Sequence, residues 1–251
     1  MSASLAPAEQ MQLAVHFHSQ GLLDNARTLY EGVLRMAPTD FSVLYHLGLL
    51  EAQAGLVERA AGYFGRAAQA QPQNADAHNN FAFTLQQLGR DGEALEAFAK
   101  AHALRPDDAD IAINLGLLHK KLQQLPQALD CFDQALQSNP QHVALLCNRG
   151  NVLQLMGQQD GALACYEQAL KVEPDNPVVL CNASNVLSEL ARYQEAFDCA
   201  DRATRAHPGH AQAWVERGNA LKLLDRTADA VASFGKALHI DPAMVQAHTS
   251  L

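Results

Sequence analysis

Prolines recur along this chain at a fixed interval of 34 residues, with no slip across seven occurrences. These prolines are Pro38, Pro72, Pro106, Pro140, Pro174, Pro208 and Pro242. Self-similarity at a period of this size is typical of solenoids, in which each repeat stacks only against its neighbours. With the proline counted as position 32, the repeats fall at about 7–40, 41–74, 75–108, 109–142, 143–176, 177–210 and 211–244. A partial eighth unit or cap is expected at 245–251, and the chain, 1–251, is predicted to form a single domain.

Small and aromatic residues keep the same period and predict two antiparallel helices per repeat. Position 20 is alanine in every repeat, and position 8 is alanine, glycine or serine. Position 24 is aromatic in six repeats and is Ala200 in the other. Small residues let two helix backbones approach closely, and we expect the ring to fill the gap between them. Glycines at position 15 mark the turn, because glycine readily takes the positive φ that ends a helix: Gly21, Gly55, Gly89 and Gly157.

The residue two positions after each proline is expected to cap the first helix of the next repeat. Four of these residues are good N-caps: Asp40, Asn74, Asp108 and Asn176. His142 and His210 are weaker caps, and Met244 is not a capping residue.

The composition narrows the class of partner. The chain has 27 acidic and 18 basic residues, a formal net charge of −9, and no basic patch, so nucleic acids and anionic membranes are not expected partners. The N-terminus lacks the basic flank and apolar run of a signal peptide, and no window reaches the length of a membrane span. Five cysteines without a CxxC pair fit a reduced, cytoplasmic protein better than a disulfide scaffold.

From about residue 7 to 244, this pattern resembles the tetratricopeptide repeat (TPR), whose signature small, aromatic and proline positions it shares. The resemblance implies an all-α fold, a right-handed superhelical solenoid of seven tandem helix-turn-helix units plus a terminal helix. It also implies that the first helix of each unit lines a concave groove with positions 2, 5, 6, 9, 12 and 13. The stretches "CNRGNVLQLMG" and "ALACYEQALKVEPDNP" look like repeats of the O-GlcNAc transferase and SPINDLY-like group. In that group an asparagine ladder binds the backbone of the protein substrate.

Asparagines recur on this inner face, although asparagine is a poor helix former. Position 6 holds Asn80, Asn114, Asn148 and Asn182, and position 9 holds Asn151, Asn185 and Asn219. An amide side chain is both donor and acceptor, so a ladder of them can pair with the backbone of an extended peptide whatever its side chains. The other interpretation is that these residues only tie adjacent helices together. Lys120 and Lys222, at position 12, either add positive charge to the groove or are ordinary solvated lysines.

Other kinds of site are less well supported. A carboxylate clamp for acidic C-terminal tails needs lysines and arginines at positions 2, 5 and 6, and these are absent. No phosphate-binding loop or hydrolase motif is present, so no catalytic residue or enzyme activity is expected. Histidines and cysteines lack partners at metal-ligand spacing, so neither a metal nor another cofactor is expected. The cysteines follow the repeat and are interpreted as buried small residues inherited by duplication. The alternative for Cys147 and Cys181, at position 5 facing the groove, is that they are accessible thiols.

We therefore expect a non-catalytic module that binds a protein or extended peptide in its groove, as the substrate-recruiting arm of an O-GlcNAc transferase-like protein would. The chain stops at "MVQAHTSL", inside the first helix of an eighth repeat, with no transferase domain. We take this to favour a fragment of a longer protein. The alternative function is a free-standing scaffold that forms a homo-oligomer, or organises a multiprotein complex, through its convex face or terminal repeats.

Overall fold

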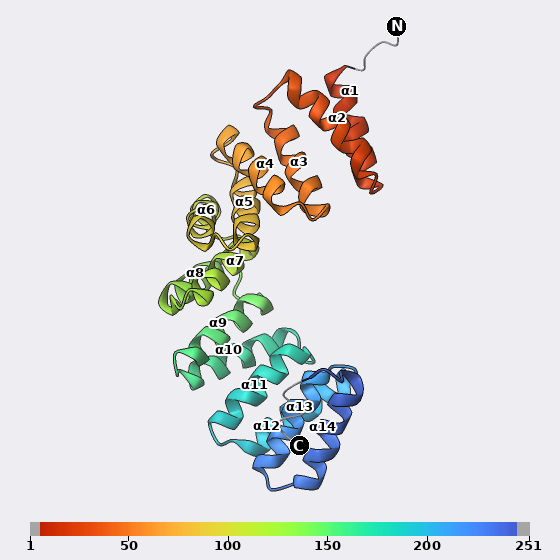
Figure 1. The fold of residues 1–251 in the computed structure, drawn as a ribbon. Helices are drawn as coiled ribbons and strands as arrows, with labels where there is room; N and C mark the ends of the chain where they lie inside the picture. Colours follow the sequence, from red (N-terminus) through yellow and green to blue (C-terminus); the bar gives the residue numbers. More distant parts are fainter. Residues whose placement is uncertain (1–5, 245–251) are drawn as a thin grey trace. The chain divides into compact units, whose positions relative to one another are not determined.

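The computed structural model describes residues 6–244 and contains fourteen α-helices in that range (Figure 1). The first helices of the repeats are α1 (Pro7–Ser19), α3 (Phe41–Gln53), α5 (Ala75–Gln87), α7 (Ala109–Lys121), α9 (Val143–Leu155), α11 (Pro177–Glu189) and α13 (Ala211–Leu223). The second helices are α2 (Leu23–Met36), α4 (Val57–Ala70), α6 (Asp91–Leu104), α8 (Leu125–Ser138), α10 (Gln159–Val172), α12 (Tyr193–Ala206) and α14 (Thr227–Ile240). One pair falls in each predicted repeat, which confirms the all-α class and the seven helix-turn-helix units. The predicted eighth unit and terminal helix, 245–251, lie outside the described residues.

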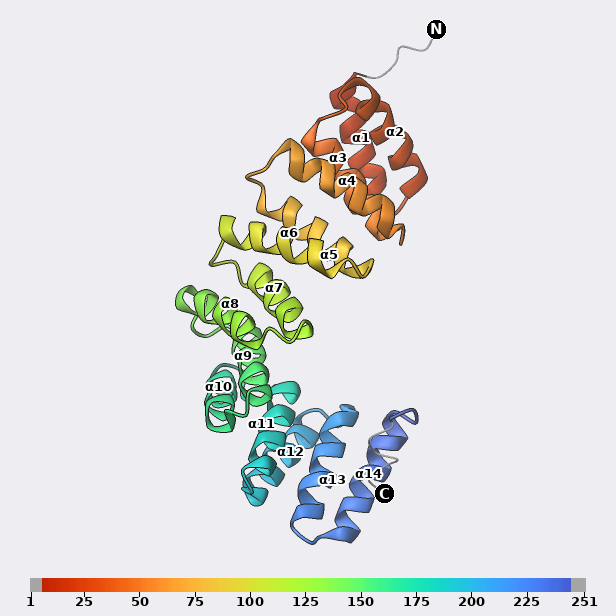
Figure 2. The same cartoon turned by 60° about the vertical axis from the view of Figure 1, so that its left-hand side comes forward.

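The helices divide between two compact units, one up to Leu118 and one from His119 onward, so the boundary falls within α7. Inside each unit, helices adjacent in sequence pack against each other, as α3 does on α4 and α13 on α14 (Figure 2). First helices also meet first helices, since α11 contacts both α9 and α13. The single domain and the right-handed twist stay predictions.

The aromatic ring at position 24 packs on the small residue at position 8 of the same repeat. A Cβ built on Gly150 would lie 2.6 Å from the ring of Tyr166, and one on Gly48 would lie 2.6 Å from that of Phe64. In the sixth repeat the ring is missing, and Ser184 Oγ instead donates a hydrogen bond of 2.8 Å to the carbonyl of Ala196. The prediction that small residues make room for the ring is confirmed.

The turn between the two helices of a repeat needs a left-handed residue at position 15. The four glycines there have φ between +72° and +75°, as predicted. The three repeats without glycine adopt the same backbone, because Gln123, Ala191 and Asp225 have φ of 58–59°. A residue with a Cβ takes this conformation at a cost of roughly 1 kcal/mol or more. Packing of the helix pair therefore imposes the turn on sequences that do not favour it.

The predicted caps form, with the expected ranking. The side chains of Asp40 and Asn74 each accept a hydrogen bond from the backbone N–H of the residue three positions later, at 3.1 and 2.9 Å. His142 and His210 also cap, through Nδ1, but at a longer 3.3 Å. Within residues 6–244 no helix combines the length and apolar character needed to cross a membrane.

Position 7, apolar in five repeats, holds an arginine in the other two, and each arginine joins consecutive repeats. Arg149 Nε donates to Asp133 Oδ1 at 2.5 Å, and Arg149 Nη1 donates to Cys165 Sγ at 3.0 Å. In the same way Arg217 donates to Asp201 at 2.9 Å and to Ser233 at 2.7 Å. Both aspartates occupy position 25 of the preceding repeat, so one sequence pair at positions 25 and 7 makes one recurring inter-repeat contact.

Candidate functional site

The first helices carry all nine residues predicted for the groove, divided between the two units. Asn80 on α5 and Asn114 on α7 lie in the first unit. The remaining seven lie in the second unit: Lys120, Asn148, Asn151, Asn182, Asn185, Asn219 and Lys222. The structure does not place one unit against the other, so the two sets form two separate candidate surfaces.

The position-6 asparagines share one contact with the preceding repeat. Asn80 Nδ2 donates to the hydroxyl of Tyr45 at 2.8 Å, and Asn114 Nδ2 donates to Asn79 Oδ1 at 3.1 Å. Asn182 Nδ2 lies 3.3 Å from Cys147 Sγ. In all three cases the acceptor belongs to position 5 of the preceding repeat, 35 residues earlier. The amide N–H group therefore ties adjacent first helices together.

Asn148 is the exception among the position-6 asparagines. Its Nδ2 donates to the carbonyl of Ala144 in its own helix at 3.0 Å. Asn148 is therefore the position-6 asparagine whose side chain holds no other helix.

The side-chain oxygens of these four asparagines remain free. Among residues 6–244, Oδ1 of Asn80, Asn114, Asn148 and Asn182 accepts no hydrogen bond. Each of the four amides is oriented by the bond that its nitrogen donates. Position 6 thus presents fixed hydrogen-bond acceptors, whereas the sequence predicted groups that offer donor and acceptor alike.

The position-9 asparagines of the second unit form hydrogen bonds with other side chains of the protein. Asn151 Oδ1 accepts from the hydroxyl of buried Tyr166 at 2.7 Å and from Asn182 Nδ2 at 3.0 Å. Asn185 Oδ1 accepts from Gln154 at 2.7 Å, and Asn219 Nδ2 donates to Glu216 at 3.3 Å. Asn151 and Asn185 thus join adjacent repeats, as the interpretation of helix-tying residues requires, whereas the bond of Asn219 stays within α13.

Glu216 takes the place of asparagine at position 6 of the last repeat, and its burial was not predicted from the sequence. The residue is only 8% exposed, and its side chain accepts from Gln212 at 2.5 Å as well as from Asn219. Burial raises the pKa of this carboxyl group, and the two amide hydrogen bonds oppose that rise. The charge of Glu216 also acts on Cys181, which fits the register of 35 residues seen at the other position-6 side chains.

Cys181 is buried, which confirms for this residue the interpretation as a buried small residue and contradicts the alternative of an accessible thiol. This residue is 5% exposed, and burial, with the charge of Glu216, raises the pKa of its thiol to about 12. Cys147 is half-buried, and burial also raises the pKa of its thiol, although the bond from Asn182 and the charge of Lys120 lower it in part. Neither thiol has the depressed pKa of a reactive cysteine.

The two predicted lysines differ in their surroundings. Lys120 lies close enough to Cys147 for its charge to lower the pKa of that thiol in part. Lys222 is exposed near the end of α13. Within residues 6–244, no group of three or more His, Cys, Asp or Glu side chains is placed to hold a metal ion.

A hollow opens on the second unit where α9 meets α11. Its volume is about 640 Å³, and Asn148, Asn151 and Cys147 line one side. Val172 and Val178, which are 41% and 51% exposed, line the other side. The free oxygen of Asn148 thus adjoins an open space with apolar walls. These valines were not predicted as site residues, because a valine at a helix end carries no signal of its own.

Position 9 of the first unit differs in chemistry from position 9 of the second unit. Val15, Leu49 and Phe83 are 37–46% exposed in a row of first helices, where the second unit has asparagines. The polar position-6 oxygens of the first unit therefore lie beside apolar side chains. This contrast is visible in the sequence once the repeats are aligned.

Comparison with known families agrees with the helix pairs. Three models described as tetratricopeptide repeat match, one over residues 11–75 and 181–245, another over 73–141 and a third over 143–176. The chain belongs to the tetratricopeptide repeat family. Members of this family bind other proteins, and the protein is accordingly a protein-interaction scaffold. The sequence matches no curated protein.

Solved structures show the same fold at low sequence identity. A tetratricopeptide repeat protein from Parabacteroides merdae is 18% identical, with 98% of this chain and 97% of the other covered and a TM-score of 0.73. The type IV pilus biogenesis factor PilW is 20% identical, with 83% and 97% covered and a TM-score of 0.71. YrrB, a TPR protein with an unusual peptide-binding site, is 23% identical, with 76% and 98% covered and a TM-score of 0.58.

Proposed function

We propose that the first helices of this tetratricopeptide repeat protein bind an extended polypeptide through the free side-chain oxygens at position 6. One observation carries the proposal: the Nδ2 atom of each asparagine is held by the protein, while its Oδ1 atom has no donor among residues 6–244. Acceptors that are already oriented lose little conformational freedom when a ligand binds.

The chemistry of these acceptors selects the backbone of a peptide as the ligand. A backbone N–H is a donor that every residue except proline supplies, so recognition by asparagine oxygens tolerates many sequences. The hollow between α9 and α11 adds room for a side chain beside Asn148, with Val172 and Val178 as apolar walls. The fold that this chain shares with the peptide-binding protein YrrB supports the same use of the repeats.

A narrower proposal is that the groove recruits protein substrates for a glycosyltransferase. It rests on the likeness of residues 147–157 and 162–177 to repeats of the O-GlcNAc transferase group. The reading frame of the gene beyond Leu251 tests it, because a glycosyltransferase domain there supports the proposal and a stop codon contradicts it. The binding of extended polypeptides does not depend on this outcome.

The direct test compares Asn148→Ala with a matched control in a binding titration. The probe is a short fluorescent peptide of glycine, serine and valine, and a second peptide of the same sequence has methylated backbone nitrogens. Because Asn148 holds no other helix, its loss should weaken binding by about threefold to tenfold without changing the fold. Asn25→Ala, on an exposed position of α2, should bind like the wild type.

Methylation of the peptide should abolish the difference between the wild type and Asn148→Ala, because the methylated ligand has no N–H to donate. Equal binding of the unmethylated peptide by the wild type and the variant would contradict the proposal for the second unit. Asn80→Ala repeats the test on the first unit.

A further inference from the structure

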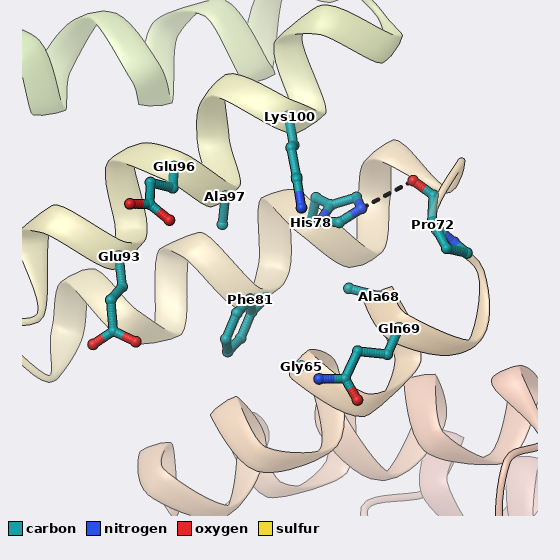
Figure 3. Close-up of a pocket in the computed structure, with 10 residues that line it drawn as sticks. All are labelled: Gly65, Ala68, Gln69, Pro72, His78, Phe81, Glu93, Glu96, Ala97 and Lys100. Atoms are coloured by element: carbon teal, nitrogen blue, oxygen red, sulfur yellow. Dashed lines mark hydrogen bonds between the residues drawn. The ribbon is translucent and has the colours of Figure 1, made fainter.

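A second hollow lies on the first unit, between the second helices α4 and α6 and above α5 (Figure 3). Its volume is about 460 Å³. Gly65 and Ala68 on α4 and Ala97 on α6 form its walls, and the half-buried ring of Phe81 on α5 forms its floor. It involves none of the position-6 or position-9 residues of the proposed peptide groove.

The hollow exists because three small residues meet at one repeat interface. Position 28 is leucine in four of the seven repeats but Ala68 here. Positions 25 and 7, which hold Asp133 with Arg149 elsewhere, hold Gly65 with Phe81 here. A Cβ on Gly65 would lie 3.1 Å from the ring of Phe81, so glycine lets the ring lie against α4. The combination leaves an aromatic surface uncovered at this interface.

Charged side chains border this aromatic surface in a fixed order along α6. Glu93, Glu96 and Lys100 lie on the same face of the helix as Ala97, and Figure 3 shows the two glutamates at one end of the hollow and Lys100 beside His78. Glu93 is paired with Arg90 at 2.6 Å. Among the residues that the structure describes, Glu96 and Lys100 have no ion-pair partner. The hollow therefore presents the carboxylate of Glu96 and the ammonium group of Lys100, both without an ion-pair partner among the described residues, beside the ring of Phe81.

We propose that this hollow binds a segment of a partner protein in which an aromatic residue lies between a basic and an acidic residue. The aromatic side chain packs on Phe81, the basic residue pairs with Glu96, and the acidic residue pairs with Lys100. Aromatic pairs of this kind contribute about 0.5–1.5 kcal/mol beyond the area they bury. The helix rises by about 6 Å between Glu96 and Lys100, and an extended chain covers that distance in about two residues. One aromatic residue therefore fits between the two charges of the ligand.

Calorimetric titration with three synthetic peptides tests the contributions of the ring and of the two charges. The probe is acetyl-Lys-Trp-Asp-amide, the second peptide has alanine in place of tryptophan, and the third has glutamine in place of lysine and asparagine in place of aspartate. The first peptide should bind at least about tenfold more tightly than either of the others, because only it satisfies the ring and both charges. Failure of the wild type to bind the first peptide, or equal binding of all three, would overturn the proposal.

Two variants locate the binding in this hollow. Ala68→Leu fills it with the residue that four other repeats carry at the same position, and Glu96→Lys reverses the free anion without altering the core. Each substitution should weaken the binding of the first peptide by about tenfold or more. The control Glu58→Lys changes an exposed glutamate elsewhere on α4 and should leave this binding unchanged. Wild-type affinity in Glu96→Lys would contradict the site even if Ala68→Leu failed to fold. Asn148→Ala should bind this peptide normally, which separates the hollow from the groove.

Discussion

The Nδ2 atom of Asn182 lies 3.0 Å from the Oδ1 atom of Asn151, one repeat earlier in the chain. The same oxygen accepts a hydrogen bond from Tyr166, so one side-chain amide joins the fifth repeat to the sixth and anchors a buried ring. Asparagines at positions 6 and 9 therefore stabilise the stacking of repeats. The oxygens at position 6 that remain free are the ones available to a ligand.

Asn182→Ala should destabilise the protein more than Asn148→Ala, although both residues occupy position 6. Asn182 donates to Asn151 and Cys147 across the repeat interface, whereas Asn148 bonds only its own helix. Loss of one partner of an inter-helix hydrogen bond costs about 1–2 kcal/mol, and loss of the local bond should cost less than about 0.5 kcal/mol. Denaturant unfolding measures both free energies, and equal losses would show that the inter-repeat bonds add no stability.

Ala191→Gly should stabilise the protein by about 1 kcal/mol, because the left-handed backbone costs a residue with a Cβ roughly 1–2 kcal/mol. Ala191 has φ of 58° at a turn where four other repeats have glycine. Glycine removes this cost but gives the unfolded chain more freedom, which reduces the gain. Thermal and denaturant unfolding check the result. The reverse change, Gly157→Ala, should destabilise by a similar amount, and a neutral outcome for both would contradict the argument.

Gly150→Ala should be destabilising because the added methyl group has no space. Its Cβ would lie 2.6 Å from the ring of Tyr166, which is fully buried. Forcing such a ring to move costs about 1–3 kcal/mol. Gly62→Ala is the matched control, since a Cβ there meets nothing within 4 Å and alanine is favoured in a helix by about 1 kcal/mol. Opposite signs in the free energy of unfolding are the expected result.

His210 should make the stability of the last repeat depend on pH. Its Nδ1 atom caps α13 by accepting from Ala213, which requires an unprotonated nitrogen. Burial, and then the charge of His207, lowers its pKa from the ordinary value of 6.5. The unfolded chain therefore binds this proton more readily than the folded chain. The stability is present above pH 6.5 and is lost as the pH falls through the lowered pKa.

The substitution His210→Asn tests this dependence, because an asparagine side chain keeps a capping acceptor at this position without titrating. Denaturant unfolding above and below pH 6.5 should show a smaller loss of stability in the variant than in the wild type. The same loss in both proteins would mean that another group causes it.

Alignment of the repeats in the sequence was enough to predict the helices, the four glycine turns and the packing of rings on small residues. These features depend on a residue and its neighbours within one repeat, as with Gly150 and Tyr166 or the cap at Asn74. Local propensity and the strict period determine these features, because each repeat makes the same short-range contacts within itself. The family likewise follows from the period of 34 residues.

Only the tertiary structure decided which asparagine atoms are free. Asn148 and Asn182 are identical in type and position, yet one bonds its own helix and the other bonds two side chains of the preceding repeat. The difference depends on which acceptor atom the preceding repeat holds 31 or 35 residues earlier in the chain. The helical periodicity of the sequence carries no information about that acceptor. The burial of Glu216 and the aromatic hollow at Phe81 have the same origin. Both features arise where side chains of adjacent repeats meet, and only the stacking of the repeats brings those side chains together.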